Sequence, residues 1–208
     1  MAFNSIANLL LYQVQRYLIG AFIGPASVTV YVLAFTVVSK VHGVINSAAE
    51  FLFPLASSMN DITYVRKIYL RMLVGSGVIA FLLLSPIAIF PKVILNFWLN
   101  HELASQVAPL MPFFALAYFF LALSPAPFHI INGIGKPNLN TLFYMLNAIV
   151  NIVLIAIFAW TGISLIKFVY AFAIANVLTS LLFQFTSEIK IWQQDLLSSK
   201  YAIVEPPK

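Results

Sequence analysis

The chain has 208 residues, of which 62% are hydrophobic and only 8% are charged. A soluble domain of this length carries about a quarter charged residues because its surface faces water, so most of this surface must face an apolar environment. The sequence contains no cysteine, which excludes disulfides, thiol nucleophiles and thiolate metal sites. The net charge of +5 does not indicate nucleic-acid binding, because the basic residues form no stripe with interleaved aromatics. These properties predict an all-α membrane protein that is embedded in the lipid bilayer, its most extensive partner.

The chain divides into apolar segments that are each long enough to cross a bilayer. A helix needs about 20 mostly apolar residues to cross roughly 30 Å of hydrocarbon. An open sheet cannot satisfy its backbone in lipid, and the period-two alternation of a membrane barrel is absent from these segments. We therefore predict a single transmembrane domain over 1–208 with six helices, near 3–23, 28–52, 68–90, 104–131, 140–161 and 164–187.

The breaks between these spans have recognisable turn and loop sequences. Gly24-Pro25 is too short to form anything but a tight turn, and so is Thr161-Gly162. Residues 54–67 and 91–105 read as polar loops, the second with an aromatic pair typical of a membrane interface. The segment 133–138 contains a Gly-x-Gly-Lys string, but Pro137 follows the lysine and no strand precedes it. A phosphate-binding Walker loop is therefore excluded, and the segment is interpreted as a turn.

Basic residues predict the orientation of the chain in the membrane. The loop at 54–67, the turn at 133–138 and the C-terminal tail carry most of the Lys and Arg, whereas the opposite side offers only Lys92 and Lys167. The positive-inside rule places the basic side, and with six spans both termini, in the cytoplasm. Residues 1–23 lack the pattern of a secretory signal. We expect a multi-pass protein of a bacterial plasma (inner) membrane.

Proline residues punctuate the fourth predicted span. Each proline removes a backbone donor and tends to kink a helix, so we expect this span to be bent or broken. Broken helices often line the substrate path of transporters, although membrane helices also tolerate proline for other reasons. The prolines are Pro109, Pro112, Pro125 and Pro127.

Polar residues recur at helical spacing within four of the spans, and so form narrow seams. The first span carries Gln15 and Arg16, the fifth carries Asn147 and Asn151, and the sixth carries Asn176 with further polar residues at steps of four. The second span has five members spaced by 4, 3, 4 and 3 residues: Thr36, Lys40, Gly43, Ser47 and Glu50.

Arg16 and Lys40 lie near the middles of their spans. Exposing both to lipid would cost about 5–7 kcal/mol even on lenient insertion scales, so we expect them to face a wet cavity or a carboxylate. The asparagines could instead hydrogen-bond neighbouring helices, each contributing under about 1 kcal/mol. Two cations with little negative charge between them favour an anionic solute. On this basis the candidate substrate-binding residues are Arg16, Lys40, Gln15, Ser47, Glu50, Asn147 and Asn151.

Three segments resemble a family of transporters. "NGIGKPNLNTLFYMLNAIVNIVLIAIFAWTGI" is similar to the glycine-spaced turn and asparagine-bearing helix of polysaccharide-export flippases. "QRYLIGAFIGPASVTVYVLAFTVV" resembles the start of their second half, and "FLFPLASSMN" the motif that ends the next span. The family is the multidrug/oligosaccharidyl-lipid/polysaccharide exporter superfamily, and the branch is that of the O-antigen (Wzx-type) flippases. The likeness covers only the C-terminal six-helix half of these proteins.

The resemblance implies one bundle of a two-bundle transporter that flips an undecaprenyl-diphosphate-linked oligosaccharide to the outer leaflet during polysaccharide biosynthesis. It implies no cofactor and no catalysis, and as partners the glycan lipid together with an N-terminal half, a second copy or polysaccharide-assembly proteins. Gln15 stands where the family often has an acidic residue, which weakens any ion-linked role at that position.

Two other functions stay open. A cation-coupled multidrug antiporter of the same superfamily should show buried carboxylates, of which the spans offer essentially Glu50. An intramembrane enzyme acting on lipid-linked sugars should show clustered His, Asp or Glu residues. His42, His101 and His129 lie in different segments, and we interpret His42 and His129 as hydrogen-bonded structural residues.

Overall fold

The computed structural model describes residues 13–58 and 62–192, and every regular element in these two ranges is a helix. Residues 13–22 are helical. The elements that follow are α2 (Pro25–Ala49), α3 (Leu52–Ser58), α4 (Ile62–Ile89), α5 (Pro91–Leu95), α6 (His101–Val107), the 3-10 turn η1 (Ala108–Leu110), α7 (Met111–Leu121), α8 (Pro125–Gly133), α9 (Pro137–Trp160) and α10 (Leu165–Trp192). The protein is therefore an all-α membrane protein, as the composition predicts.

Within the described ranges, five helical stretches are long and apolar enough to cross a membrane. They are Pro25–Ser58, Tyr64–Ile89, His101–Gly133, Pro137–Trp160 and Leu165–Ile189. They correspond to the second to sixth predicted spans. Of the first predicted span, 3–23, residues 1–12 lie outside the described residues, and 13–22 form a helix.

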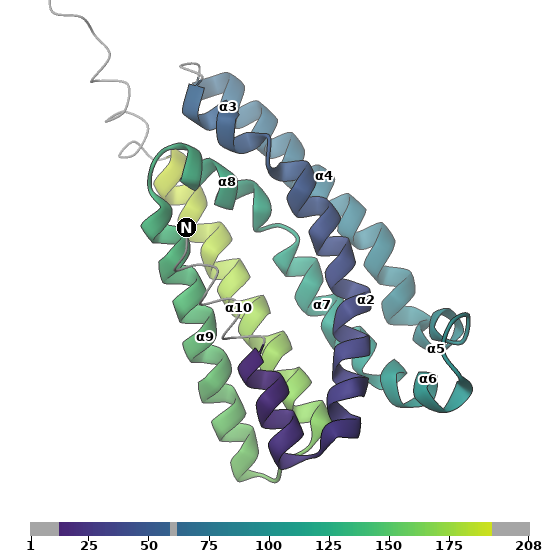
Figure 1. Cartoon of the computed structure of the whole chain (residues 1–208). Coiled ribbons are helices and arrows are strands. Elements are labelled where there is room, and N and C mark those ends of the chain that lie inside the picture. The colour runs from purple at the N-terminus through teal and green to yellow at the C-terminus, as the bar shows by residue number, and fades with distance from the viewer. Residues whose placement is uncertain (1–12, 59–61, 193–208) are drawn as a thin grey trace, which may run out of the picture.

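The helices form an elongated bundle around the fourth span. In Figure 1, α7 and α8 run between the α2–α4 pair on one side and the α9–α10 pair on the other. Helix α7 packs against α2, α4 and α10, while α10 also packs along α9. The helical segment 13–22 returns through a tight turn into α2.

An aromatic cluster joins three of these helices at the centre of the bundle. The ring of Phe35 on α2 lies 5.9 Å from Tyr118 on α7 and 6.3 Å from Phe172 on α10, measured between centroids. The rings of Tyr31 and Phe114 approach to 5.2 Å at 71°. Edge-on pairs of this kind contribute about 0.5–1.5 kcal/mol beyond area burial, so the cluster fixes how α2, α7 and α10 face one another.

The fourth span is broken, as its prolines predict. The α-helix ends at Leu121 and restarts at Pro125, with turn bonds from Leu123 N to Phe120 O and from Ser124 N to Leu121 O. Pro125 and Pro127 have no N–H to continue the ladder. The same span is tightened to a 3-10 turn at Ala108–Leu110, which contains Pro109.

Two predicted loops are wrong. Residues 54–67 are not a polar loop, because α3 continues through Pro54 to Ser58 and α4 already begins at Ile62. Proline is tolerated in the first turn of a helix, where its missing N–H costs nothing, and Pro54 is the third residue of α3. The segment 91–105 contains α5 and α6 rather than continuous loop; Pro91 occupies the first turn of α5 and the Asn100 side chain caps α6 by accepting from Leu103 N at 2.8 Å.

The three predicted turns are confirmed, and at the one between α9 and α10 Gly162 has φ 99°. Gly24 has φ 122° and Pro25 follows as the first residue of α2. Gly135, at φ 79°, lies between the end of α8 and the start of α9 at Pro137. Such left-handed conformations favour glycine, and the Gly-x-Gly-Lys string is thus a helix-to-helix turn with Lys136 exposed.

Gly133 allows α8 to approach α3 closely. A Cβ atom at this position would lie 2.7 Å from Ala56 Cβ and 2.7 Å from the carbonyl oxygen of Phe53. Neither atom can move without shifting a backbone, because one is the first side-chain carbon of a helix residue and the other is main chain. The contact ties the end of the second span to the end of the fourth.

We expect Gly133→Ala to lower the stability of the bundle by about 1–3 kcal/mol through overpacking. Gly75→Ala on α4 is the matched control, because nothing lies within 4 Å of the added Cβ, and it should be neutral or slightly stabilising. The measurement is the fraction of monodisperse protein that survives a heating series in detergent. Equal survival of the two variants would contradict the close approach of α3 and α8.

Candidate functional site

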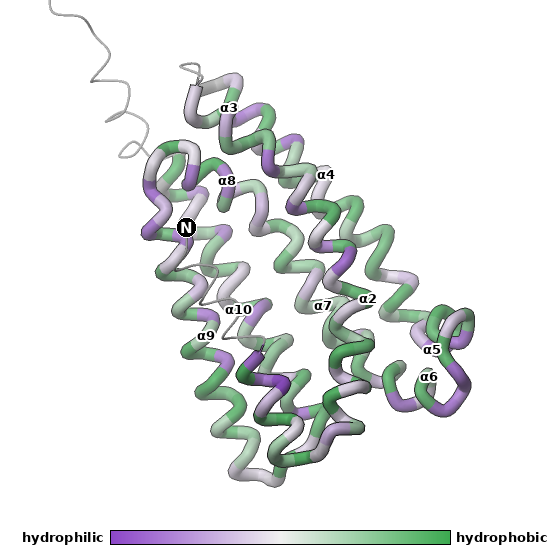
Figure 2. The backbone as a smooth tube through the Cα atoms, in the orientation of Figure 1, coloured by the Kyte–Doolittle hydropathy of each residue, from purple (hydrophilic) through white to green (hydrophobic). Residues whose placement is uncertain are grey.

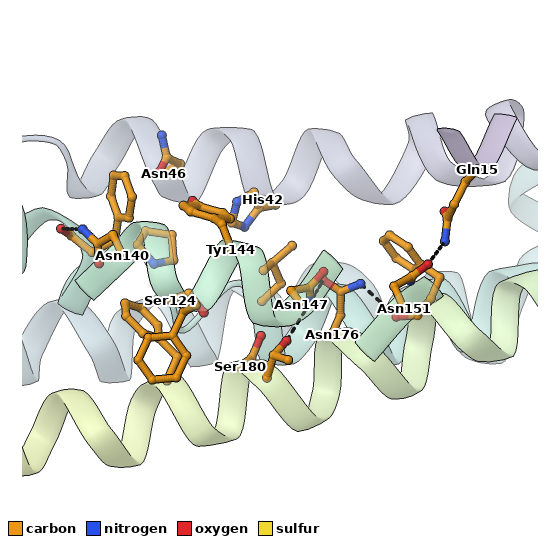
Figure 3. A pocket seen from close by; sticks show the side chains of 17 residues that line it. Gln15, His42, Asn46, Ser124, Asn140, Tyr144, Asn147, Asn151, Asn176 and Ser180 are labelled. Atoms are coloured by element: carbon orange, nitrogen blue, oxygen red, sulfur yellow. Dashed lines mark hydrogen bonds between the residues drawn. The ribbon is translucent and has the colours of Figure 1, made fainter. Parts of the chain in front are cut away.

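A cavity of about 300 Å³ lies inside the bundle, bounded by segment 13–22, α2, the α7–α8 break, α9 and α10. Figure 3 shows it extending along the helices from Asn140 towards Gln15. Its polar lining consists of amides, hydroxyls and one imidazole, namely Gln15, His42, Asn46, Ser124, Asn140, Tyr144, Asn147, Asn151, Asn176, Thr179 and Ser180. The apolar part is Leu121, Pro125, Phe128, Phe143, Phe172 and Phe183. We refer to it as the amide cavity.

The amide cavity lies at the break in the fourth span. Leu121, Ser124 and Pro125, which flank the interruption between α7 and α8, all line it. Non-helical backbone at membrane depth is tolerated only where protein or a wet cavity satisfies it. Discontinuous helices of this kind form binding sites in many transporters. The cavity at this break is therefore a candidate binding site.

One chain of hydrogen bonds joins three helices at the end of the cavity marked by Gln15. The Gln15 amide nitrogen donates to Asn151 Oδ1 at 2.6 Å, and the Tyr31 hydroxyl donates to Gln15 Oε1. Gln15 and Asn151 are only 3% and 2% exposed. Segment 13–22, α2 and α9 are therefore joined by hydrogen bonds between buried polar side chains.

A second group of amides connects α9 with α10 in the middle of the cavity. Asn147 Nδ2 donates to Thr179 Oγ1 at 2.6 Å and to Asn176 Oδ1 at 3.3 Å. Asn176 Nδ2 donates to the Phe172 carbonyl at 2.8 Å. At the far end, Asn140 Nδ2 donates to Phe128 O at 3.0 Å and to Asn132 Oδ1 at 2.9 Å. The alternative that the asparagines hydrogen-bond neighbouring helices is confirmed for Asn147, Asn151 and Asn176, which also line the cavity.

Some polar atoms of the lining have no partner among the described residues. Asn140 Oδ1 and His42 Nδ1 are buried without a hydrogen bond, and the Asn140 side chain is only 1% exposed. The expectation that His42 and His129 are hydrogen-bonded is wrong for the described ranges, where neither side chain forms such a bond and His129 Nε2 is buried alone. A buried unpaired polar atom costs roughly 1–3 kcal/mol, so such atoms indicate a place for water or ligand.

The second-span seam faces away from the cavity. Its five members, Thr36, Lys40, Gly43, Ser47 and Glu50, are all exposed. We refer to them as the α2 stripe. Lys40 and Glu50 form no ion pair with any described residue. The α2 residues that do line the cavity are His42 and Asn46. Helix α2 therefore has one polar face inside the bundle and another on its outer surface.

The exposed faces of the neighbouring spans are apolar by contrast. Helix α4 exposes Val74, Val78 and Leu82, and α9 exposes Ile149 and Ile157, as expected for contact with lipid. Figure 2 shows hydrophilic positions interrupting the hydrophobic tubes of α2, α9 and segment 13–22. The α2 stripe is therefore a polar exposed surface beside apolar ones.

Arg16 packs against α2 beside the aromatic cluster. Its guanidinium carbon is 5.5 Å from the centroid of the Phe35 ring, and its buried Nε has no hydrogen-bond partner among the described residues. A cation over an aromatic face contributes about 0.5–2 kcal/mol, which offsets part of the cost of a cation in the span. Phe35 precedes Lys40 by five residues, or roughly 7–8 Å along α2, so the two cations lie at neighbouring depths.

The structure thus separates six of the seven candidate residues into two groups of three and places Arg16 in neither. Gln15, Asn147 and Asn151 line the amide cavity, whereas Lys40, Ser47 and Glu50 lie on the exposed α2 stripe. Arg16 borders α2 but is not part of the cavity lining. The seven candidates do not include the aromatic lining or several polar members of it, among them His42, Ser124, Asn140, Tyr144 and Thr179. Asn140 and Tyr144 share the helical seam of Asn147 and Asn151, with steps of 4, 3 and 4 residues.

These features define a multi-pass α-helical membrane protein with a hydrogen-bonding cavity at a broken span. Over 169 residues the chain is 30% identical to the Uncharacterized membrane protein MJ1068 of Methanocaldococcus jannaschii. The match covers 76% of this chain and 31% of the relative, so the chain spans less than a third of the length of that relative. No protein-family model and no solved structure matches the chain.

The bond between Gln15 and Asn151 predicts a measurable coupling. Gln15→Leu or Asn151→Leu alone leaves the other amide buried without its partner, which should cost about 1–3 kcal/mol each. The double variant Gln15→Leu/Asn151→Leu should cost less than the sum of the two, by about 0.5–3 kcal/mol. Thermal unfolding of the four proteins in one detergent measures this coupling. Strict additivity would show that the two side chains do not interact.

Proposed function

We propose that this protein is one bundle of a membrane transporter that flips a polyprenyl-diphosphate-linked oligosaccharide between leaflets. The observation that carries the proposal is the α2 stripe, an exposed polar face with a lysine near the middle of a span. A lysine at mid-bilayer costs roughly 2.5–3.5 kcal/mol in lipid on the lenient scale. Water or another polar surface over the stripe removes that cost.

A second, unlike bundle is the partner that best fits the stripe. Copies of one chain with the same topology would pair about an axis along the membrane normal. Such pairing would put Lys40 opposite Lys40 and Glu50 opposite Glu50, and like charges facing each other are unfavourable. An aqueous cavity between this bundle and a different one avoids the repulsion. The resemblance to the two-bundle exporters supports the same arrangement.

The charges of the stripe suggest which part of the substrate it contacts. Lys40 is an exposed cation, and Arg16 lies at a neighbouring depth with an unpaired Nε. Ammonium and guanidinium groups are the usual protein partners of phosphate oxygens. In the proposed mechanism, these two residues hold the diphosphate while the glycan occupies the space between the bundles.

The proposed location is a plasma (inner) membrane with both termini cytoplasmic. The end of the bundle with the exposed basic residues Arg66, Lys67, Arg71 and Lys136 would face the cytoplasm by the positive-inside rule. At the opposite end the described chain offers Lys92 and Lys167, and Lys167 Nζ donates to the carbonyl oxygens of Thr161 and Gly162 at 2.7 Å.

The lining of the amide cavity favours a flippase over the two alternatives. A cation-coupled antiporter would use carboxylates to bind its ion, whereas the described lining residues are neutral amides, hydroxyls, one imidazole and apolar side chains. An enzyme on lipid-linked sugars would need several titratable groups together. The described lining has His42 and Tyr144, and they lie on different helices.

The cysteine-free sequence allows a direct test of the stripe. Single substitutions Thr36→Cys and Ser47→Cys, in membranes, should react with a charged, membrane-impermeant thiol reagent, because thiolates react only where water reaches them. Val78→Cys on the exposed apolar face of α4 is the control and should stay unlabelled. Labelling is measured by the mass shift of the purified protein. Equal protection of all three cysteines would place the stripe against lipid or dry protein and would remove the support for a cavity.

Neutralising Lys40 should impair transport of the lipid-linked glycan. Lys40→Gln removes a charge-assisted contact of about 1.5–3 kcal/mol, so we expect translocation to fall by roughly ten- to a hundredfold. Lys92→Gln, outside the spans on α5, is the matched neutralisation and should have no effect. The measurement is flipping of a fluorescent polyprenyl-diphosphate glycan in membrane vesicles from cells carrying each variant at the native gene. Wild-type rates for Lys40→Gln would contradict the assigned role.

A further inference from the structure

The amide cavity is separated from the α2 stripe and differs from it in chemistry. The stripe carries Lys40 and Glu50, whereas no lining residue of the cavity has a carboxylate, ammonium or guanidinium group. Helix α2 lies between the two regions, with His42 and Asn46 on its inner side. A ligand of the cavity need not be the group that the stripe binds.

The hydrogen bonds of the lining disfavour a charged guest of either sign. An anion would enter a membrane-embedded space with no opposing charge, and desolvation of an uncompensated ion costs several kcal/mol. A cation would find no carboxylate among the lining residues, and the amide oxygens of Gln15, Asn151 and Asn176 already accept hydrogen bonds from Tyr31, Gln15 and Asn147 respectively. The Nδ2 donor of Asn151 has no acceptor among the described residues, and its N–H groups repel a cation.

The lining instead suits a guest whose groups both donate and accept hydrogen bonds. Asn140 Oδ1 is an unpaired acceptor, and His42 forms no hydrogen bond within the described ranges. Asn46 and Ser180 form none there either, and both line the cavity. A hydroxyl group supplies one donor and two acceptor lone pairs, so a guest with several hydroxyls can pair with amide, imidazole and hydroxyl partners at once.

Aromatic rings complete the lining between these polar groups. Phe128 comes from α8, Phe143 from α9, and Phe172 and Phe183 from α10. Rings of this kind give a guest apolar contact area, while a few polar groups fix its orientation. Figure 3 shows His42, Tyr144, Asn147 and Asn176 near one another along the middle of the cavity. The volume of about 300 Å³ is at the lower end of ligand pockets and is enough for one small ring.

We propose that the amide cavity binds one uncharged, hydroxyl-rich group of the size of a single sugar residue. The inference rests on the proposed function, since the glycan of the transported lipid is the natural source of such a group. The α2 stripe then contacts the diphosphate, and the amide cavity contacts a neutral sugar unit. A free neutral glycoside has the same chemistry and serves as the probe.

The test is saturation-transfer NMR on the full chain in lipid nanodiscs, with methyl glucoside and methyl N-acetylglucosaminide as neutral probes. Methyl glucuronide and sodium ion, the latter compared with choline in thermal unfolding, are the charged comparisons. We expect ring-proton signals from at least one neutral glycoside, a weaker response from the glucuronide, and no stabilisation by sodium. No saturation of any neutral glycoside overturns the proposal, as does a sodium-specific stabilisation.

Variants locate the binding in the cavity. His42→Leu and Asn46→Leu each remove a polar group that forms no hydrogen bond within the described part of the chain, so neither breaks a bond that the fold uses. Each should weaken glycoside binding by roughly tenfold, the effect of one lost hydrogen bond. Lys92→Gln, outside the spans on α5, should leave glycoside binding unchanged. Equal glycoside signals in all three variants and the wild type would place the binding elsewhere and overturn the proposal.

The same variants separate this inference from the proposed function. Glycoside binding that His42→Leu abolishes, in a protein that does not flip the lipid-linked glycan, would support the site and contradict the flippase. Normal flipping by His42→Leu and Asn46→Leu, together with absent glycoside binding in the wild type, would support the flippase and overturn the site.

Discussion

The central physical constraint on this protein is that backbone and side-chain polar groups inside a membrane must find partners within the protein. The fourth span violates helical continuity at Pro125 and Pro127, and the interruption needs polar or wet surroundings. The bundle supplies them by placing the amides of segment 13–22, α9 and α10 next to the break. The Gln15–Asn151 and Asn147–Asn176 bonds then set the relative positions of those helices. The cavity and the helix packing thus follow from one requirement.

Aromatic packing supports this arrangement from the other side of the cavity. Phe172 belongs both to the cavity lining and to the aromatic cluster with Phe35 and Tyr118. The same cluster carries Arg16 over the Phe35 ring. A movement of α2 relative to α10 would therefore alter the cluster, the surroundings of Arg16 and the cavity wall together. In the proposed transporter, this connects the outer stripe of α2 with the interior of the bundle.

The α2 stripe carries charged side chains, whereas the lining of the amide cavity is neutral. Transport of a lipid-linked glycan has to accommodate an anionic diphosphate and neutral sugar units, which need different surroundings. An exposed face with Lys40 can contact the former while hydrated, because water screens and solvates the charges. A cavity lined by amides and phenyl rings can contact the latter without burying an unpaired charge. The two faces of α2 present these two environments on one helix.

The sequence by itself determined the membrane class, the all-α fold, the positions of most spans and the break in the fourth. These depend on local properties: runs of apolar residues, missing proline donors and glycine turns act on their own segments. Periodicity also identified the polar seams correctly. It could not tell that the seam of Lys40 and Ser47 lies outside the bundle while those of Gln15, Asn147 and Asn151 converge inside it. Spacing fixes which residues share a face of one helix, but the direction of that face depends on packing between helices far apart in the chain. The contact of Gly133 with Ala56, and the inclusion of His42 and Asn140 in one cavity, were likewise decided only by the tertiary structure.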